Sequence, residues 1–279
     1  MILVFGASGQ VARALGLLPD VRCLSRADVD LEYPLNCAEA IAMHRPAAVI
    51  NAAAYTQVDG AETDAARAHM INAAAPEAMA EACLELGVPF VSLSTDYVFD
   101  GSGDAPWSET DTPAPLNGYG RSKLAGEQAI AQVGGTWAVM RTSWVVSAHG
   151  GNFVKTMRRL GAERDALNVV ADQIGGLTPA RDIARACHHM AKTLISEPDK
   201  GGLYHFSGAE DASWADVARE IFVQAKLACT VTDIPTTQYP TPAQRPLNSR
   251  LDCHKIDAMF GLKRPDWRAG LADILDELA

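Results

Sequence analysis

The stretch ILVFGASGQVA, residues 2–12, decides the fold of this 279-residue chain. It opens with an apolar, strand-like run, and two glycines follow before a segment with helical spacing. Gly6 permits a tight turn, and Gly9 lets the backbone approach a pyrophosphate, which the free N–H groups of the next helix can bind. Ala12 replaces the third glycine of this pattern. The stretch therefore predicts a dinucleotide site at the first strand–helix junction.

Strand-like and helix-like segments alternate after this stretch. The pattern predicts an α/β fold with a doubly wound parallel Rossmann sheet, whose strand ends meet along one edge where ligands bind. We expect residues 1–150 to form the NAD(P)-binding domain. Residues 151–279 are expected to form mainly a smaller α+β substrate lobe, with some elements returning to the first domain. The predicted strands are 2–7, 21–25, 47–54, 89–95 and 136–144, and the predicted helices are 10–18, 34–44, 64–86 and 119–133.

The end of the second predicted strand bears on the choice of coenzyme. NAD-specific sites usually carry a carboxylate there for the ribose 2′-hydroxyl, whereas this chain has Ser25 and Arg26. A 2′-phosphate would gain a charge-assisted contact from Arg26 and a hydrogen bond from Ser25. We therefore predict NADPH in preference to NADH, with NADH left open as a second coenzyme. The alternative for Arg26 is an ordinary solvated side chain. Asp30 and Leu31 are expected to frame the adenine.

The stretch YGRSKLAGE places Tyr119 and Lys123 four residues apart, and therefore on one face of a predicted helix. A phenol with a pKa near ~10 needs a neighbouring cation to act as an acid–base group at neutral pH, and Lys123 supplies one. Thr95 ends the fourth predicted strand, where its hydroxyl can bond a substrate carbonyl oxygen. These three are the predicted catalytic residues of a ketone reductase. Tyr97 has Gly101 four positions later instead of a lysine, so it is expected to contact substrate or to pack.

This ordered combination resembles the extended short-chain dehydrogenase/reductase superfamily: a glycine loop, NAAA after the third strand, Ser-Thr after the fourth, then Tyr-x-x-x-Lys. Within it, NAAAYTQVDGAE, STDYVFDG, VVADQIGGLTP and YPTPAQRPLNSRLD are similar to segments of the dTDP-4-dehydrorhamnose reductase family. The resemblance runs nearly end to end. It implies NADPH-dependent reduction of the C4 ketone of dTDP-4-dehydro-β-L-rhamnose. Two alternatives stay open: a reductase or epimerase of another nucleotide sugar, and a non-catalytic regulatory subunit similar to that of methionine adenosyltransferase.

The resemblance also implies roles for individual residues. Thr95, Asp96 and Trp144 match sugar-contacting positions, and Tyr97 is expected to shape the same pocket. Arg245 is the candidate for the diphosphate, with a solvated loop arginine as the alternative. Some relatives form a magnesium-bridged dimer, but Ala14 stands where the bridging acid would align, which speaks against Mg²⁺ and leaves a monomer or a homodimer open. Positions in coenzyme-contacting segments are Gly9, Gln10, Val11, Asp30, Leu31, Ala54, Tyr55 and Thr56, beside Tyr119 and Lys123.

The composition limits the class of partners. A net charge of −10 argues against nonspecific nucleic-acid binding, which requires a basic face. The six cysteines include no C-x-x-C pair and are expected to be free thiols in a reducing cytosol. The chain opens on a strand, without a signal-peptide pattern, and no apolar run is long enough to span a bilayer. We therefore predict a cytoplasmic protein with no membrane partner. No cluster with metal-ligand spacing is present.

Overall fold

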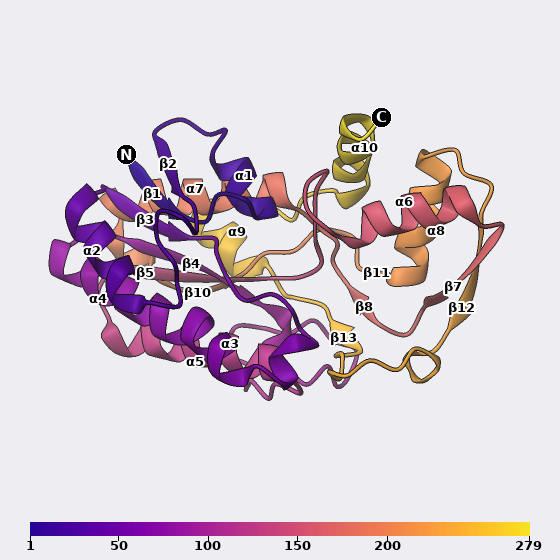
Figure 1. The fold of residues 1–279 in the computed structure, drawn as a ribbon, viewed down its shortest axis with the longest axis horizontal. Coiled ribbons are helices and arrows are strands. Elements are labelled where there is room, and N and C mark those ends of the chain that lie inside the picture. Colours follow the sequence, from indigo (N-terminus) through magenta and orange to yellow (C-terminus); the bar gives the residue numbers. More distant parts are fainter.

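The computed structural model describes residues 1–279 and contains a sheet of six parallel strands in the order β10-β5-β4-β3-β1-β2 (Figure 1). The chain places β2 on one side of β1 and β3 on the other, so the strand order reverses between β1 and β3. In such sheets ligands bind at this switch point, beyond the carboxyl ends of the strands. The predicted fold class is confirmed. The strands are β1 (Ile2–Phe5), β2 (Val21–Leu24), β3 (Ala48–Asn51), β4 (Phe90–Thr95), β5 (Trp137–Thr142) and β10 (Gly202–His205).

Helices cover both faces of this sheet, which explains why its strands are apolar on both sides. Ile2 and Val4 pack with α1, α7 and α9 on one face, whereas Leu3 and Phe5 pack with α2, α4 and α5 on the other (Figure 1). The strand period of two thus divides one apolar run between two cores. These helices are α1 (Gln10–Leu15), α2 (Pro34–His44), α4 (Ala75–Leu86), α5 (Gly118–Val133), α7 (Ala180–Ser196) and α9 (His254–Phe260).

The predicted helix at 64–86 is helical throughout but not regular. It consists of α3 (Ala65–His69), a π-helical turn η2 (Met70–Ala74) and α4. This turn lies against α5, where a Cβ atom on Gly126 would lie 2.1 Å from the Asn72 carbonyl oxygen. Only a glycine allows such a close approach of the two backbones. The π turn brings Asn72 to the edge of the site described below, as such turns often do.

A second lobe has its own core, built mainly from α6 (Phe153–Glu163), α8 (Trp214–Gln224) and α10 (Trp267–Glu277) (Figure 1). The stretch ALNVVADQIGG forms two strands, β7 (Ala166–Val170) and β8 (Ile174–Gly175). The division falls at Asp172, whose carboxylate accepts hydrogen bonds from the backbone N–H and hydroxyl of Thr236. The remaining strands of this half are β6 (Val145–Val146), β9 (Thr178–Pro179), β11 (Ala212–Ser213), β12 (Thr230–Ile234) and β13 (Asn248–Ser249).

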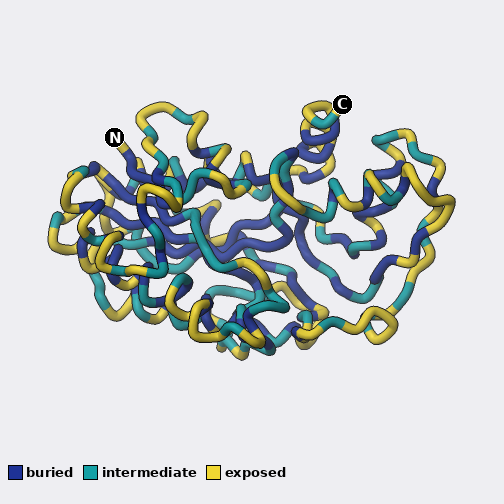
Figure 2. The backbone as a smooth tube through the Cα atoms, viewed as in Figure 1, coloured by how far each residue is buried: buried dark blue, intermediate teal, exposed yellow.

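Three elements beyond residue 150 belong to the first lobe by their packing. The strand β10 pairs with β5 at the edge of the main sheet, and α7 and α9 cover one of its faces. We therefore propose that the dinucleotide domain is residues 1–150 completed by α7, β10 and α9. Figure 2 shows the most buried backbone in the strands of the main sheet and in the segments that connect it to the second lobe. None of the helices has the length and apolar character needed to cross a membrane.

Candidate active site

The glycine loop after β1 has the shape that a pyrophosphate requires. Gly6 has φ +113°, and a Cβ atom there would lie 3.3 Å from the Cβ of Ala12, so both backbone angle and space select glycine. Gly9 caps α1, and a Cβ there would meet only the Ala52 carbonyl oxygen, at 3.9 Å. The first turn of α1 contains no acidic side chain. An open loop, free N–H groups and no opposing carboxylate fit a dinucleotide at this position.

The side chain of Gln10 is engaged within the protein. Its amide nitrogen donates to the Val145 carbonyl at 3.2 Å, and its amide oxygen accepts from Ser147 at 2.8 Å and Asn152 at 2.9 Å. Gln10 therefore ties the glycine loop to the segment that leads into the second lobe, and its backbone N–H is the group left for a coenzyme. Val11, the next predicted contact, is buried and packs in the core beneath the loop.

The predicted ribose-phosphate residues lie together in a charged cluster beyond β2. Arg26 Nη2 lies 3.0 Å from Asp30 Oδ2 and 2.5 Å from Glu32 Oε1, and its side chain is 65% exposed. Arg67 contacts the same Glu32 oxygen at 2.7 Å. A phosphate arriving here would meet two arginines, but each already has a carboxylate partner. Ser25 donates its hydroxyl to Asp28 at 2.6 Å, and this bond holds the pKa of Asp28 below its usual range.

The predicted catalytic residues come from β4 and α5. Thr95 ends β4, and its hydroxyl oxygen accepts from the Tyr97 backbone N–H at 3.2 Å, which starts a short 3-10 turn, η3 (Asp96–Val98). Tyr119 is the second residue of α5, and Asn117 caps this helix by accepting from the Gly120 N–H at 2.8 Å. Burial raises the pKa of Tyr119 to about 12, an effect that the Thr95 hydroxyl opposes. Tyr119 is therefore protonated at neutral pH, as a proton donor must be.

Lys123 follows one turn later on α5 and is buried. Its Nζ donates to the Leu93 carbonyl of β4 at 2.7 Å. Burial lowers the pKa of Lys123 to about 8, and Glu127 acts in the opposite direction. Lys123 is thus mainly an ammonium at neutral pH and loses its proton on the alkaline side.

Asn72, a buried residue of the π turn that was not among the predicted site residues, orders the loop of Ala54, Tyr55 and Thr56. Its Oδ1 accepts from the Tyr55 N–H at 2.8 Å, and its Nδ2 donates to the Tyr55 carbonyl at 3.0 Å and the Ser122 hydroxyl at 2.9 Å. These bonds fix Ala54, Tyr55 and Thr56 against the catalytic helix. Nothing in the spacing of the sequence signals this role, because Asn72 and Ser122 are 50 positions apart.

Three predicted substrate residues gather beside Thr95. Asp96 is 2% exposed, with Oδ1 accepting from the Thr95 hydroxyl at 3.1 Å and Oδ2 buried without a partner. Burial raises the pKa of Asp96 to about 6, an effect that the nearby hydroxyls of Ser249 and Thr95 oppose. Tyr97 packs edge-on against Tyr119, with ring centroids 5.9 Å apart. Arg245 lies close enough to Tyr97 to oppose the rise that burial causes in the pKa of that phenol.

Arg245 is not the solvated loop residue that the sequence left as an alternative. Its side chain is 17% exposed and its Nη2 lies 2.9 Å from Asp59 Oδ1. Asp59 also accepts from the Ala243 N–H at 3.1 Å. Asn117, the cap of α5, donates to the Gln244 carbonyl at 2.8 Å. The proline-rich loop is thus fastened to both the coenzyme side and the catalytic helix.

Trp144, the remaining predicted substrate residue, lies where β5 leads into the second lobe. It has a left-handed backbone with φ +49° and stacks on Trp214 with ring centroids 3.7 Å apart. It packs within the core of the second lobe, and its carbonyl accepts from the Thr178 N–H at 3.1 Å. Trp144 therefore stands at the boundary of the two lobes, two residues beyond the end of β5, which pairs with the strand that carries Thr95.

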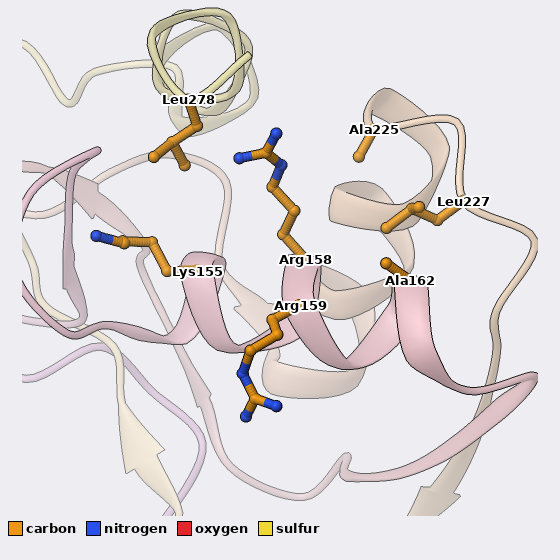
Figure 3. Close-up of a pocket in the computed structure, with 7 residues that line it drawn as sticks. All are labelled: Lys155, Arg158, Arg159, Ala162, Ala225, Leu227 and Leu278. Atoms are coloured by element: carbon orange, nitrogen blue, oxygen red, sulfur yellow. The ribbon is translucent and has the colours of Figure 1, made fainter.

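A separate surface cavity of about 410 Å³ lies in the second lobe, away from these residues (Figure 3). The cations from α6 do not converge in it, since Arg159 points away from Lys155 and Arg158 (Figure 3). Arg159 instead pairs with Glu163 at 3.1 Å on the same helix. The cavity contains none of the predicted site residues. Its lining is Lys155, Arg158, Arg159, Ala162, Ala225, Leu227 and Leu278.

The parallel sheet, the open glycine loop and the Thr95–Tyr119–Lys123 constellation define an NAD(P)H-dependent oxidoreductase of the extended short-chain dehydrogenase/reductase class. The chain belongs to the RmlD substrate binding domain family, which matches it over residues 1–279. The family resemblance drawn from the sequence is therefore confirmed.

Several similar proteins are named dTDP-4-dehydrorhamnose reductase. The chain is 42% identical to the dTDP-4-dehydrorhamnose reductase of Escherichia coli (strain K12), and the matched region covers 99% of this chain and 97% of that protein. It is 44% identical to the protein of that name from Burkholderia thailandensis, covering 96% and 95%. A crystal structure of dTDP-4-dehydrorhamnose reductase from Bacillus anthracis in complex with NADP is similar, with a TM-score of 0.91, 35% identity and coverage of 99% and 98%.

Proposed function

We propose that this protein reduces the C4 ketone of dTDP-4-dehydro-β-L-rhamnose to dTDP-β-L-rhamnose with NADPH. The observation that carries the proposal is the position of Tyr119 beside the Thr95 hydroxyl at the carboxyl end of β4, with Lys123 one turn later on the same helix and its Nζ on the Leu93 carbonyl of β4. Relatives named dTDP-4-dehydrorhamnose reductase, similar over nearly the whole chain, support the choice of substrate. We further propose that it acts in the cytoplasm, as a monomer or a homodimer.

The proposed reduction assigns one task to each catalytic side chain. When the substrate binds, Thr95 turns its hydroxyl proton from Asp96 Oδ1 to the ketone oxygen and polarises the carbonyl. Tyr119 transfers its hydroxyl proton to that oxygen, which becomes the C4 hydroxyl, and Tyr119 is left as a phenolate. The ammonium of Lys123 stabilises this phenolate through its charge. When bound, the nicotinamide supplies the hydride for the carbonyl carbon.

The remaining residues bind and orient. We propose that the loop from Gly6 to Val11 holds the pyrophosphate of the coenzyme and that Lys123 also holds the nicotinamide ribose. Asp96 Oδ2 is buried and accepts no hydrogen bond within 3.5 Å, although the Ser249 hydroxyl lies near this carboxylate, so it is the proposed acceptor for a sugar hydroxyl. Arg245 is the proposed contact for the diphosphate, and Trp144 lines the sugar pocket.

A coupled assay tests this function. The 4-keto-L-sugar nucleotide is offered with NADPH, and coenzyme oxidation is compared with product formed, beside a panel of other nucleoside-diphosphate 4-ketosugars. The proposal predicts one NADPH oxidised per molecule of product and fastest turnover with the dTDP substrate. Product without net NADPH oxidation would indicate an epimerase, which reuses its coenzyme. No turnover with any sugar, together with a stable complex with another enzyme, would indicate a regulatory subunit.

We propose that the preference for NADPH over NADH depends on Arg26. We expect Arg26→Ala to raise the KM for NADPH about tenfold, because a charge-assisted hydrogen bond to the 2′-phosphate is lost. The KM for NADH should change by less than about twofold, since NADH carries no 2′-phosphate. Parallel steady-state kinetics with both coenzymes measure this difference. Arg22→Ala, at an exposed arginine of β2, is the matched control and should change neither constant. An equal rise for both coenzymes would remove Arg26 from the phosphate site.

We expect the buried carboxylate of Asp96 to bind substrate and, when ionised, to lower the free energy of unfolding of the protein. Its pKa is about 6 in the folded protein and about 3.9 in an unfolded chain, so stability falls as pH rises between these values and stays lower above pH 6. Asp96→Asn cannot ionise, so we expect it to stabilise the protein by about 2–3 kcal/mol at pH 8 and by little at pH 4. Its KM for the sugar nucleotide should rise about tenfold. Thermal unfolding at the two pH values tests the claim, which an equal shift of Tm at both would contradict.

A further inference from the structure

A buried charged pair lies one helical turn beyond Lys123. The side chains of Glu127 and Arg141 are 8% and 2% exposed. Arg141 Nε donates to the two carboxylate oxygens at 2.9 and 3.2 Å, and Nη2 donates to Oε2 at 2.6 Å. Ser94 donates its hydroxyl to the same carboxylate. Glu127 is thereby held in place from two neighbouring strands, β4 and β5.

Lys123 lies close to this carboxylate in the fold. Lys123 and Glu127 are four positions apart and so lie on one face of α5. Both line a small internal space, together with Ser94, that has no room for a water molecule. Lys123 and Glu127 do not form an ion pair, but charges that no water separates are poorly screened, so the carboxylate acts on the ammonium across this space. The lysine is oriented from the same strand, since its Nζ donates to Leu93, the neighbour of Ser94.

We infer that Glu127 and Arg141 are positioning residues for the proposed reduction, acting through Lys123: Glu127 keeps Lys123 in its ammonium form beside Tyr119, and Arg141 fixes the carboxylate that does so. Neither residue touches substrate or coenzyme in this role. The inference rests on the proposed function for the step that it serves. The direction in which Glu127 moves the pKa of Lys123, against the effect of burial, agrees with it.

The other titratable groups near the pair do not obscure its effect. His205 Nε2 lies 3.4 Å from Arg141 Nη1, and its Nδ1 donates to the Trp107 carbonyl at 3.0 Å. Burial and Arg141 lower the pKa of His205 to about 3, so it stays neutral at and above neutral pH. Asp96 and Glu109 are carboxyl groups, and they belong to the acidic side of a pH profile. The alkaline side therefore reports Lys123 and Tyr119.

Opposite charge changes in the pair give opposite expected results. In Glu127→Gln, the alkaline limb of the kcat profile should move to lower pH by about 1–3 units, because a stabilising negative charge is lost. In Arg141→Met, the limb should move to higher pH, because a repelling positive charge is lost. The expected directions are the same whether Lys123 or Tyr119 produces the limb. Loss of a nearby negative charge lowers the pKa of either group, and loss of a nearby positive charge raises it. A purely structural role would lower kcat in both variants and leave the limb in place.

Controls separate this inference from folding and from the assigned substrate. Glu163→Gln removes a surface carboxylate of α6 and should leave the limb unmoved. Where a single variant does not fold, the double variant Glu127→Gln/Arg141→Met carries the test, because removing both partners of a buried pair is tolerated far better than removing one. Its limb should still move to lower pH, since the carboxylate is the partner nearer to Lys123 on α5.

The affinity for NADPH, followed by coenzyme fluorescence against pH, gives the same readout without any sugar. Limbs that stay in place, or that move in one direction in both single variants, would overturn the inference. If the pH dependence of NADPH affinity shifts as predicted but no sugar is turned over, the proposed function is refuted and the inference about Glu127 and Arg141 stands.

Discussion

A Tyr119→Phe variant is expected to lose turnover by a factor of about 10²–10⁴, the usual contribution of a positioned proton donor. The substitution removes one hydroxyl from a side chain held between Thr95 and the Tyr97 ring. The phenyl ring keeps the packing, so the affinity for NADPH and the Tm should stay close to those of the original protein. Single-turnover rates and a fluorescence titration with NADPH measure the two properties separately.

Tyr97→Phe is the matched control for this variant. Tyr97 lies beside Tyr119, with ring centroids 5.9 Å apart and planes at 77°. The two substitutions therefore each remove one phenolic hydroxyl, from neighbouring rings. We expect Tyr97→Phe to keep turnover within about tenfold, because Tyr119, not Tyr97, shares a face of α5 with Lys123. The cation near Tyr97 is Arg245, which is already paired with Asp59. A large loss in Tyr97→Phe with activity retained in Tyr119→Phe would exchange their roles.

The parts of the fold and site that follow local rules could be predicted from the sequence. Apolar runs punctuated by glycines predicted five strands of the main sheet, and a spacing of four placed Tyr119 and Lys123 on one helix face. The place of the sixth strand, β10, in this sheet could not be predicted, because its partner β5 lies more than 60 residues earlier. Pairing over such a distance depends on tertiary packing, which periodicity does not report.

The supporting residues of the site show the same limit. Arg26 follows β2, and its contact with the 2′-phosphate stays a prediction, but the Arg67 that shares its partner Glu32 arrives only through the approach of α3. Glu127 stands in the YGRSKLAGE stretch itself, four positions after Lys123, yet its partner Arg141 is on the next strand. Arginine and glutamate are common on protein surfaces, so the roles of Arg26, Glu127 and Arg141 can be recognised only from their partners in the folded chain.

The substitution of Gly120 by alanine is expected to damage stability and catalysis together. Gly120 follows Tyr119 directly on α5, and a Cβ atom there would lie 2.1 Å from the Tyr97 carbonyl oxygen and 3.0 Å from Pro115 Cβ. Alanine favours a helix over glycine by about 1 kcal/mol, which acts against the clash. A contact of 2.1 Å with backbone cannot be relieved by rotating a side chain, so α5 itself has to move. We expect a net loss of about 1–3 kcal/mol, as overpacked cores show.

The loss of activity in Gly120→Ala should exceed what the loss of stability explains. Moving α5 away from η3 separates Tyr119 from Thr95, and a misplacement of about 1 Å can cost about 10²-fold in rate. Measured at a temperature where the variant is fully folded, kcat should therefore fall about 10²-fold, while NADPH affinity falls less. Gly151→Ala is the matched control, since its Cβ would meet nothing within 4 Å, and both its Tm and its kcat should be retained. A destabilised Gly120→Ala variant with normal kcat when folded would mean that the distance between α5 and η3 does not set the rate.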